Sequence, residues 1–319
     1  MREITYNQAV GEALQEEFRR DGKTVHLSTM VPADLLNEFG EARVREAPIS
    51  ESAIVGAAVG LAGSGFRPVI DIGLATFGFV AMDQIVSQAA KITYMFGGQA
   101  CFPILYRMGV GAGFLMAAQH SISPYSMFMN VPGLKIILPA TPYDAKGLLK
   151  SAVRENNPVI YFEHMAFRFR NLTGPVPEEE YTIPLGKADI KRAGTDVTVV
   201  ALAWMLHEVL PVAEELASEG ISVEVIDPRT LVPLDIETIR ASVRNTGHLV
   251  VVDEACPTCG AAAEIISAVT EDADTFHRLK SPPQRVCGLE VPIPFSPPLE
   301  VYSLPTRERI ISAIKQVMT

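Results

Sequence analysis

Residues 50–72 read SESAIVGAAVGLAGSGFRPVIDI, and this stretch contains one complete helix–strand unit. Ser50 can act as an N-cap, and Glu51 to Ser64 is apolar nearly all round, which predicts a buried helix. Pro68–Ile72 is rich in β-branched residues and predicts the strand that follows. A helix joined so closely to a strand is typical of the βαβ units that build a parallel sheet.

The same alternation extends to both ends of the chain. Before residue 171, further strands are predicted at 24–28, 103–107, 134–138 and 159–162, and helices from a capping box at Thr5–Gln8 to Arg20, at 80–96 and at 142–155. Residues 171–185 combine Pro, Gly and three consecutive Glu, a composition typical of a linker. Beyond them, strands are predicted at 197–201, 223–226 and 249–252, and helices at 206–218, 236–243, 261–270 and 306–317. We therefore predict an α/β fold with two domains, residues 1–180 and residues 181–319.

Composition excludes several classes of partner. The 319 residues include 27 Lys+Arg and 37 Asp+Glu, a formal net charge of −10, and an acidic surface repels nucleic acid. No apolar run approaches the ~20 residues that a membrane-spanning helix needs. Arg2, Glu3 and Glu12 interrupt any apolar core of a signal peptide. We expect a cytoplasmic protein with a small-molecule substrate and with neither nucleic acid nor membrane as a partner.

Familiar catalytic motifs are missing from the chain. It has no GxGxxG after the first strand, no GxxxxGK[ST], no GxSxG and no HExxH, which argues against Rossmann, P-loop, hydrolase and zincin sites. Cys256-Pro-Thr-Cys259 is a CxxC without a second pair to complete a zinc set. We interpret these thiols as packed at a strand–helix turn, with a redox or metal role as the alternative.

Two polar residues contrast with their apolar surroundings. Glu51 lies in the first turn of the predicted buried helix, where the helix dipole favours a carboxylate. It is either a helix-start residue or an acid kept in a dry interior for proton chemistry. His120 lies between a Gly-rich and a Pro-containing loop, and its spacing alone leaves structural and catalytic roles open.

Ordered motifs over nearly the whole chain resemble those of one enzyme family. They are Pro48-Ile-Ser-Glu51, Ile54-Val-Gly-Ala-Ala-Val-Gly60, Met82-Asp-Gln-Ile-Val86, Tyr94-Met-Phe-Gly-Gly98, Ala118-Gln-His-Ser121, Asp227-Pro-Arg-Thr230 and Pro292-Ile-Pro-Phe-Ser-Pro-Pro-Leu299. This set resembles the beta subunit of thiamine-diphosphate-dependent 2-oxoacid (pyruvate or acetoin) dehydrogenases, a transketolase-like family. The resemblance implies a pyrimidine-binding domain, a parallel sheet with flanking helices, followed by a transketolase C-terminal α/β domain.

The resemblance also implies the cofactor and its site. Thiamine diphosphate is the cofactor of that family, and Glu51 matches the glutamate whose hydrogen bond to N1′ of the aminopyrimidine activates it. Phe77 matches the aromatic residue that stacks on the pyrimidine, and Ile49 is a further cofactor-binding position. His120 matches an active-site histidine that works in proton transfer or in handling the acyl acceptor.

Metal ligands and partners follow from the same resemblance. This chain lacks the Gly-Asp-Gly stretch that, with a downstream Asn, binds Mg²⁺ beside the diphosphate. We therefore expect magnesium on an alpha subunit, in an α2β2 heterotetramer whose chains share the cofactor. Some relatives hold a potassium ion near the positions of Ile104, Ala152, Glu155 and Asn157.

The expected reaction cleaves a 2-oxoacid or acetoin and transfers the acyl group to lipoamide on a dihydrolipoyl acyltransferase core. One departure from the family keeps an alternative open: Leu27-Ser-Thr-Met-Val-Pro32 replaces an acidic turn and a longer Gly-rich loop. The alternative is a two-chain acyloin synthase or transketolase-like ligase without a lipoyl complex. A catalytically silent subunit is a third hypothesis, and the retention of Glu51, Phe77 and His120 argues against it.

Overall fold

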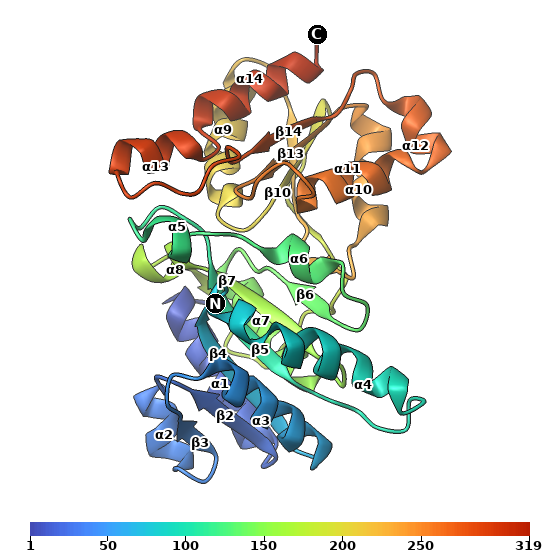
Figure 1. The fold of residues 1–319 in the computed structure, drawn as a ribbon. Helices are drawn as coiled ribbons and strands as arrows, with labels where there is room; N and C mark the ends of the chain where they lie inside the picture. The colour runs from blue at the N-terminus through green and yellow to red at the C-terminus, as the bar shows by residue number, and fades with distance from the viewer. The chain divides into compact units, whose positions relative to one another are not determined.

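The chain folds into two compact units. The computed structural model describes residues 1–319 (Figure 1). Met1–Val110 and Met127–Leu185 form the first unit, and Gly111–Ser126 and Gly186–Thr319 form the second. The sequence places a boundary at 180/181, whereas contacts place it at 185/186 and group residues 111–126 with the second unit.

A parallel sheet organises the first unit, with strand order β6-β7-β5-β4-β2-β3. Every pair of neighbours in this order is parallel. The strands are β2 (Thr24–Ser28), β3 (Val44–Glu46), β4 (Arg67–Leu74), β5 (Leu105–Val110), β6 (Lys135–Ile137) and β7 (Val159–His164). Every residue of β5 is buried, as expected for a central strand covered on both faces.

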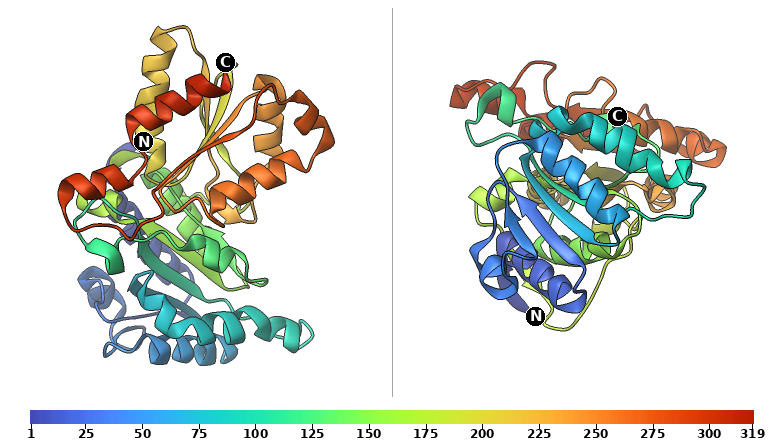
Figure 2. Two further views of the ribbon diagram at one scale, coloured as in Figure 1. Left: turned by 45° about the horizontal axis from the view of Figure 1, so that its top comes forward. Right: turned by 60° about the horizontal axis from the view of Figure 1, so that its bottom comes forward.

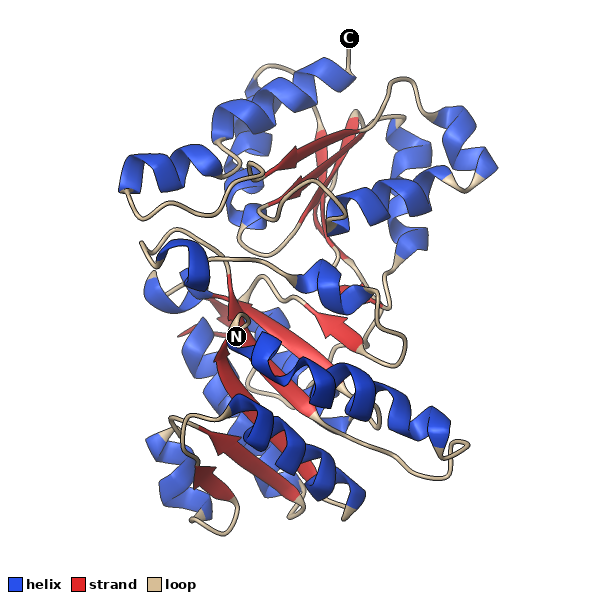
Figure 3. Cartoon of the chain, viewed as in Figure 1, coloured by secondary structure: helices blue, strands red, loops and turns tan.

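Helices cover both faces of this sheet (Figures 2 and 3). On one face, α1 (Tyr6–Arg20) and α7 (Pro142–Arg154) pack against each other. On the other face, α3 (Glu51–Gly63) packs on β4 and on η1 (Phe77–Ala81). The remaining elements are β1 (Arg2–Thr5), α2 (Ala33–Phe39), η2 (Asp83–Ala89), α4 (Ala90–Met95), α8 (Met165–Phe169) and β8 (Thr173–Val176).

The local signals at helix starts are confirmed. The Gln8 backbone N–H donates to Thr5 Oγ1 at 3.1 Å, and the Thr5 N–H donates to Gln8 Oε1 at 2.8 Å, which is the predicted capping box. Thr141 caps α7 through the Asp144 N–H, and Pro142 occupies the first turn, where its missing N–H costs nothing.

Three expectations differ from the structure. The helix predicted at 80–96 is instead a 3-10 helix, a π-helix and an α-helix in succession, η1, η2 and α4. The predicted linker contains β8, which pairs antiparallel with β1. The prediction of a fully buried α3 is wrong, because Ala53, Ala57 and Gly60 are exposed. These exposed residues are small, so the helix leaves little apolar area in water.

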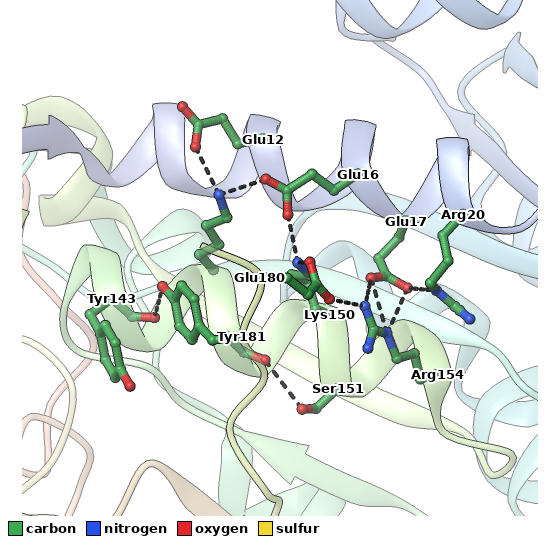
Figure 4. Close-up of polar contacts among 12 residues, drawn as sticks. Glu12, Glu16, Glu17, Arg20, Tyr143, Lys150, Ser151, Arg154, Glu180 and Tyr181 are labelled. Atoms are coloured by element: carbon green, nitrogen blue, oxygen red, sulfur yellow. Dashed lines mark hydrogen bonds and ion pairs between the residues drawn. The ribbon is translucent and has the colours of Figure 1, made fainter. Parts of the chain in front are cut away.

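Two buried lysines join α1 to α7 (Figure 4). Lys146 and Lys150 are at most 1% exposed, and both bind Glu16 of α1, at 2.6 Å and 2.5 Å. Glu12 accepts a second bond from Lys146 at 3.0 Å, and Glu180 is the second partner of Lys150. Burial acts to raise the pKa of Glu16, but the two lysines outweigh it and lower that pKa.

A second, smaller sheet organises the other unit, in strand order β14-β13-β10-β11-β9. Its parallel strands are β10 (Val197–Ala201), β11 (Val223–Asp227), β13 (Leu249–Asp253) and β14 (Gln284–Cys287), and β9 (Asp189–Arg192) is an antiparallel edge. α9 (Met205–Ser218) and α14 (Arg307–Val317) lie on one face, and α10 (Ile236–Thr246) and α11 (Ala261–Thr270) lie on the other (Figure 1).

Shorter elements complete the chain. They are α5 (Ala117–His120), α6 (Tyr125–Met129), β12 (Thr230–Val232), α12 (Ala273–Arg278) and α13 (Pro297–Ser303). Among all these helices, none combines the length and the apolar character that crossing a bilayer requires.

Candidate active site

Glu51 begins α3, immediately after the loop that leaves β3. Its side chain is half-buried, and no hydrogen bond or ion pair within the chain engages its carboxylate. Ile49, two residues earlier, is 84% exposed. Glu51 is therefore an acceptor group that is held in place by its helix and has its oxygens available.

Phe77 begins η1 after β4, and the fold links it to Glu51. The Ser52 hydroxyl donates to the Val80 carbonyl oxygen at 2.7 Å, which ties the first turn of α3 to η1. Gly73 has φ +81°, and a Cβ built on it would lie 3.7 Å from the Phe77 ring. The ring therefore rests against the backbone of β4 and remains half-buried.

Both residues lie where the carboxyl ends of parallel strands place a ligand. β3 and β4 lie on either side of β2, so the segments that follow them emerge at the same edge of the sheet. A carboxylate without a partner in the chain can bind the edge of a flat, nitrogen-containing ring, and a half-buried aromatic ring can stack on its face. These residues fit the aminopyrimidine of thiamine diphosphate.

A cavity of about 610 Å³ opens at this edge of the first unit. Its lining includes α1 residues, Ser28 to Pro32 of the short turn after β2, and a charged cluster. In this cluster Arg107 binds Glu163 at 2.7 Å and Asp71 at 3.2 Å. Burial raises the pKa of Glu163 although the charge of Arg107 opposes it. This cluster was not predicted, and its only signal in the sequence is charged residues inside otherwise apolar strands.

His120 ends the short helix α5 and belongs to the second unit, whereas Glu51 and Phe77 belong to the first. Its side chain is half-buried. Three carboxylates of the same unit, Asp253, Glu254 and Glu300, accept hydrogen bonds from the segment that carries His120, residues 111–126. The sequence analysis did not single out these three acids.

Three of the four positions named for potassium, Ile104, Ala152 and Glu155, use their carbonyl oxygens in hydrogen bonds within the chain. The Ile104 carbonyl accepts from the Val159 N–H at 2.8 Å, and the Ala152 carbonyl accepts from the Glu155 N–H at 3.2 Å. The Arg67 guanidinium donates to the Glu155 carbonyl at 2.9 Å and to the Asn156 side chain at 2.7 Å. Arg67 thus places a positive charge beside the Glu155 carbonyl oxygen, and a potassium ion at these four positions stays a prediction.

No group of three or more His, Cys, Asp and Glu side chains is placed to hold a metal ion. Cys256 and Cys259 lie in the turn between β13 and α11, as expected, but they are exposed free thiols rather than packed ones. Partial desolvation of the thiol and the charges of Glu290 and Asp253 raise the pKa of Cys256, which disfavours its reactive thiolate.

Family comparisons agree with this architecture. The transketolase pyrimidine-binding domain family matches residues 2–166, and the transketolase C-terminal domain family matches residues 186–310. A solved structure titled "Split gene transketolase, inactive beta4 tetramer" has the same fold, with a TM-score of 0.80 and 23% identity, and covers 99% of this chain and 98% of that one.

Curated relatives match along their full length. The chain is 43% identical to the acetoin:2,6-dichlorophenolindophenol oxidoreductase subunit beta of Cupriavidus necator, over 99% of this chain and 98% of the relative. It is 40% identical to the pyruvate dehydrogenase E1 component subunit beta of Bacillus subtilis, over 100% and 99%. It is 38% identical to the 2-oxoisovalerate dehydrogenase subunit beta of the same organism, over 98% of each. The chain therefore belongs to the transketolase-like family of beta subunits of thiamine-diphosphate-dependent acetoin and 2-oxoacid dehydrogenases.

Proposed function

We propose that this chain is the beta subunit of a two-chain enzyme that cleaves acetoin or a 2-oxoacid beside its carbonyl group and passes the acyl group to lipoamide. The observation that carries the proposal is the unengaged carboxylate of Glu51 at the start of α3, tied through the Ser52–Val80 hydrogen bond to the short helix that begins with Phe77. The names of the full-length relatives support this range of substrates.

Each site residue has one task in this proposal. The Glu51 carboxyl group would hold the aminopyrimidine of the cofactor through a hydrogen bond, and the half-buried Phe77 ring would stack on that heterocycle. Ile49 would be a further contact to the cofactor, and His120 would move a proton at the substrate or at the acyl acceptor. When bound, thiamine diphosphate supplies the nucleophilic carbon and the electron sink for cleavage.

The partner supplies what this chain lacks. We propose an alpha subunit that contributes the Asp and Asn oxygens for Mg²⁺, in an α2β2 heterotetramer that works with a dihydrolipoyl acyltransferase core. The absence of Gly-Asp-Gly from this sequence supports a cofactor site shared by two chains. The expected location in the cytoplasm stays a prediction.

Titration calorimetry with thiamine diphosphate and Mg²⁺ tests the shared site. The chain alone, its co-expressed alpha partner alone and the assembled pair are titrated separately. We expect tight binding only by the pair, because each chain holds one half of the cofactor. Tight binding by this chain alone would contradict the shared site.

Substitution of Glu51 tests the chemistry in the assembled pair. We expect Glu51→Gln to lower turnover by about 100-fold or more, because it removes a proton-transfer group while it keeps the volume of the side chain. Glu46→Gln is the matched control, since Glu46 is an exposed carboxylate at the end of β3. Unchanged turnover in Glu51→Gln would favour a catalytically silent subunit.

One observation keeps the ligase alternative in place. The short turn after β2 replaces the acidic turn and the longer loop of the family, and this departure supports the alternative. The turn lines the cavity of about 610 Å³, whose lining includes neither Glu51 nor Phe77. Product analysis with acetoin, pyruvate or a branched-chain 2-oxoacid, with and without lipoamide, separates the two reactions. Reductive acylation of lipoamide would exclude the ligase. Formation of an acyloin with an added aldehyde, with no acylation of lipoamide when lipoamide is present, would exclude the dehydrogenase.

A further inference from the structure

The segment that carries His120 has a strained backbone. Leu115 and Ala117 both have φ of 59°, in the left-handed region that residues with a Cβ rarely adopt. Gly111 and Gly113 have φ of 98° and 96°. Such conformations persist only where surrounding contacts hold them in place, so the contacts of this segment determine where α5 and His120 lie.

Glu300 of α13 holds the first half of the segment. The Gly113 N–H donates to Glu300 Oε1 at 3.0 Å, and the Leu115 N–H donates to the same oxygen at 3.2 Å and to Oε2 at 3.3 Å. Glu300 is 2% exposed and has no ion-pair partner. A buried carboxylate without a cation is costly, and here charge-assisted bonds from the backbone of this segment compensate for its burial.

Glu254, the residue after β13, closes the segment on itself. One oxygen, Oε1, accepts from the Ala112 N–H at 2.9 Å and from the Ser123 hydroxyl at 3.0 Å. Ala112 precedes His120 and Ser123 follows it, so a single carboxylate joins the two ends of the segment. The Gly111 N–H also donates to the Ile122 carbonyl at 3.2 Å, and Tyr125 donates to Asp253.

We propose that Glu254 and Glu300 are positioning residues for His120, and that the second unit serves in catalysis as the clamp that fixes the histidine segment. This inference rests on the proposed function, because it takes His120 as an active-site group. Neither acid needs to touch the cofactor or the substrate. Both act by holding backbone and side-chain donors on either side of α5.

Hydrogen exchange tests the clamp without activity. In the full chain, Glu300→Leu removes all three acceptor contacts, and we expect the Gly113 and Leu115 amides to exchange about tenfold faster or more. Glu271→Leu is the matched control, because Glu271 is an exposed carboxylate of the same unit with no side-chain partner. Unchanged exchange in Glu300→Leu would overturn the clamp.

Kinetics of the assembled pair tests positioning. We expect Glu300→Leu to lower kcat about tenfold or more with little change in the KM of the donor substrate, because a misplaced group costs rate rather than binding. Glu300→Gln keeps the volume and one acceptor oxygen, so it should recover part of the rate. It is also the variant to use if Glu300→Leu does not fold.

A double-mutant cycle with His120→Ala assigns the effect to the histidine. If Glu300 acts through His120, Glu300→Leu has almost no further effect on kcat in the His120→Ala background. Additive losses would overturn the proposal, since Glu300 would then act elsewhere. A pair that is inactive with every donor would remove the proposed function itself, and His120→Ala at full activity would remove the role proposed for His120. In both cases the exchange experiment would still report whether the clamp exists.

Discussion

His26 lies in the middle of β2 and is fully buried. Burial lowers its pKa to about 4; the charge of Arg107 acts in the same direction, and that of Asp71 opposes it. In the unfolded chain the imidazole titrates near 6.5, so between about pH 6.5 and pH 4 the unfolded state binds the proton and the folded state does not. The contribution of neutral His26 to stability is therefore present above pH 6.5 and is lost as the pH falls through this window.

We predict that His26→Leu flattens the acid side of the stability curve. Between pH 7 and pH 4.5 the wild type should lose up to about 3 kcal/mol more of its unfolding free energy than the variant loses. Urea unfolding of both proteins at several pH values measures the difference. Parallel curves for the two proteins would show that His26 does not titrate in this window.

Some of the candidate site residues could be predicted from the sequence, and others could not. Glu51 and His120 stand out because they are polar groups in apolar or glycine-rich surroundings. Glu254 and Glu300 do not, because their partners are mainly backbone N–H groups more than 140 residues earlier in the chain, at Ala112, Gly113 and Leu115. Backbone donors leave no trace in side-chain identity, so only the folded structure reveals these acids.

Elements specified by local chemistry were predicted well. The start of α1 depends on Thr5 and Gln8, three residues apart, and the start of α7 depends on Thr141 and Pro142. The pairing of β8 with β1 joins segments about 170 residues apart, so a Pro- and Gly-rich composition could not reveal it. The division of residues 77–95 into three helix types is also invisible in an apolar pattern that fits any helix.

The pairing of α1 with α7 depends on Glu16, which serves both buried lysines (Figure 4). We predict that Glu16→Ala lowers the unfolding free energy by about 2–3 kcal/mol, because Lys146 and Lys150 each keep only one carboxylate partner in a buried site. Urea unfolding measures this change.

A surface pair provides the control for this prediction. Glu219 binds Lys315 at 2.5 Å, but both side chains are nearly half exposed. Glu219→Ala should therefore change the unfolding free energy by only about 0–1 kcal/mol. Equal effects of the two substitutions would mean that burial of the lysines adds nothing to the α1–α7 contact.

At the scale of the whole molecule, the first unit presents a conspicuous apolar tip. Tyr94, Met95 and Phe96, at the end of α4, are 89%, 73% and 57% exposed. Contiguous exposed apolar side chains on a globular protein mark an interaction surface rather than ordinary surface composition. Together with α3, whose exposed face consists of small residues, this tip favours close contact with another chain.

We predict that Tyr94→Glu combined with Phe96→Glu prevents assembly with the alpha subunit and leaves the melting temperature of the isolated chain unchanged. Neither ring belongs to a core of this chain, whereas the two introduced glutamates would bring two charges into a buried interface. Sedimentation of the co-expressed chains measures assembly. Phe276→Glu is the control, since Phe276 is 55% exposed on α12 of the second unit without such neighbours.

Because half of the cofactor site is expected on the partner, loss of assembly should also abolish binding of thiamine diphosphate. If the double variant assembled and bound the cofactor normally, this tip would lie outside the interface, and the exposed face of α3 would be the next surface to test.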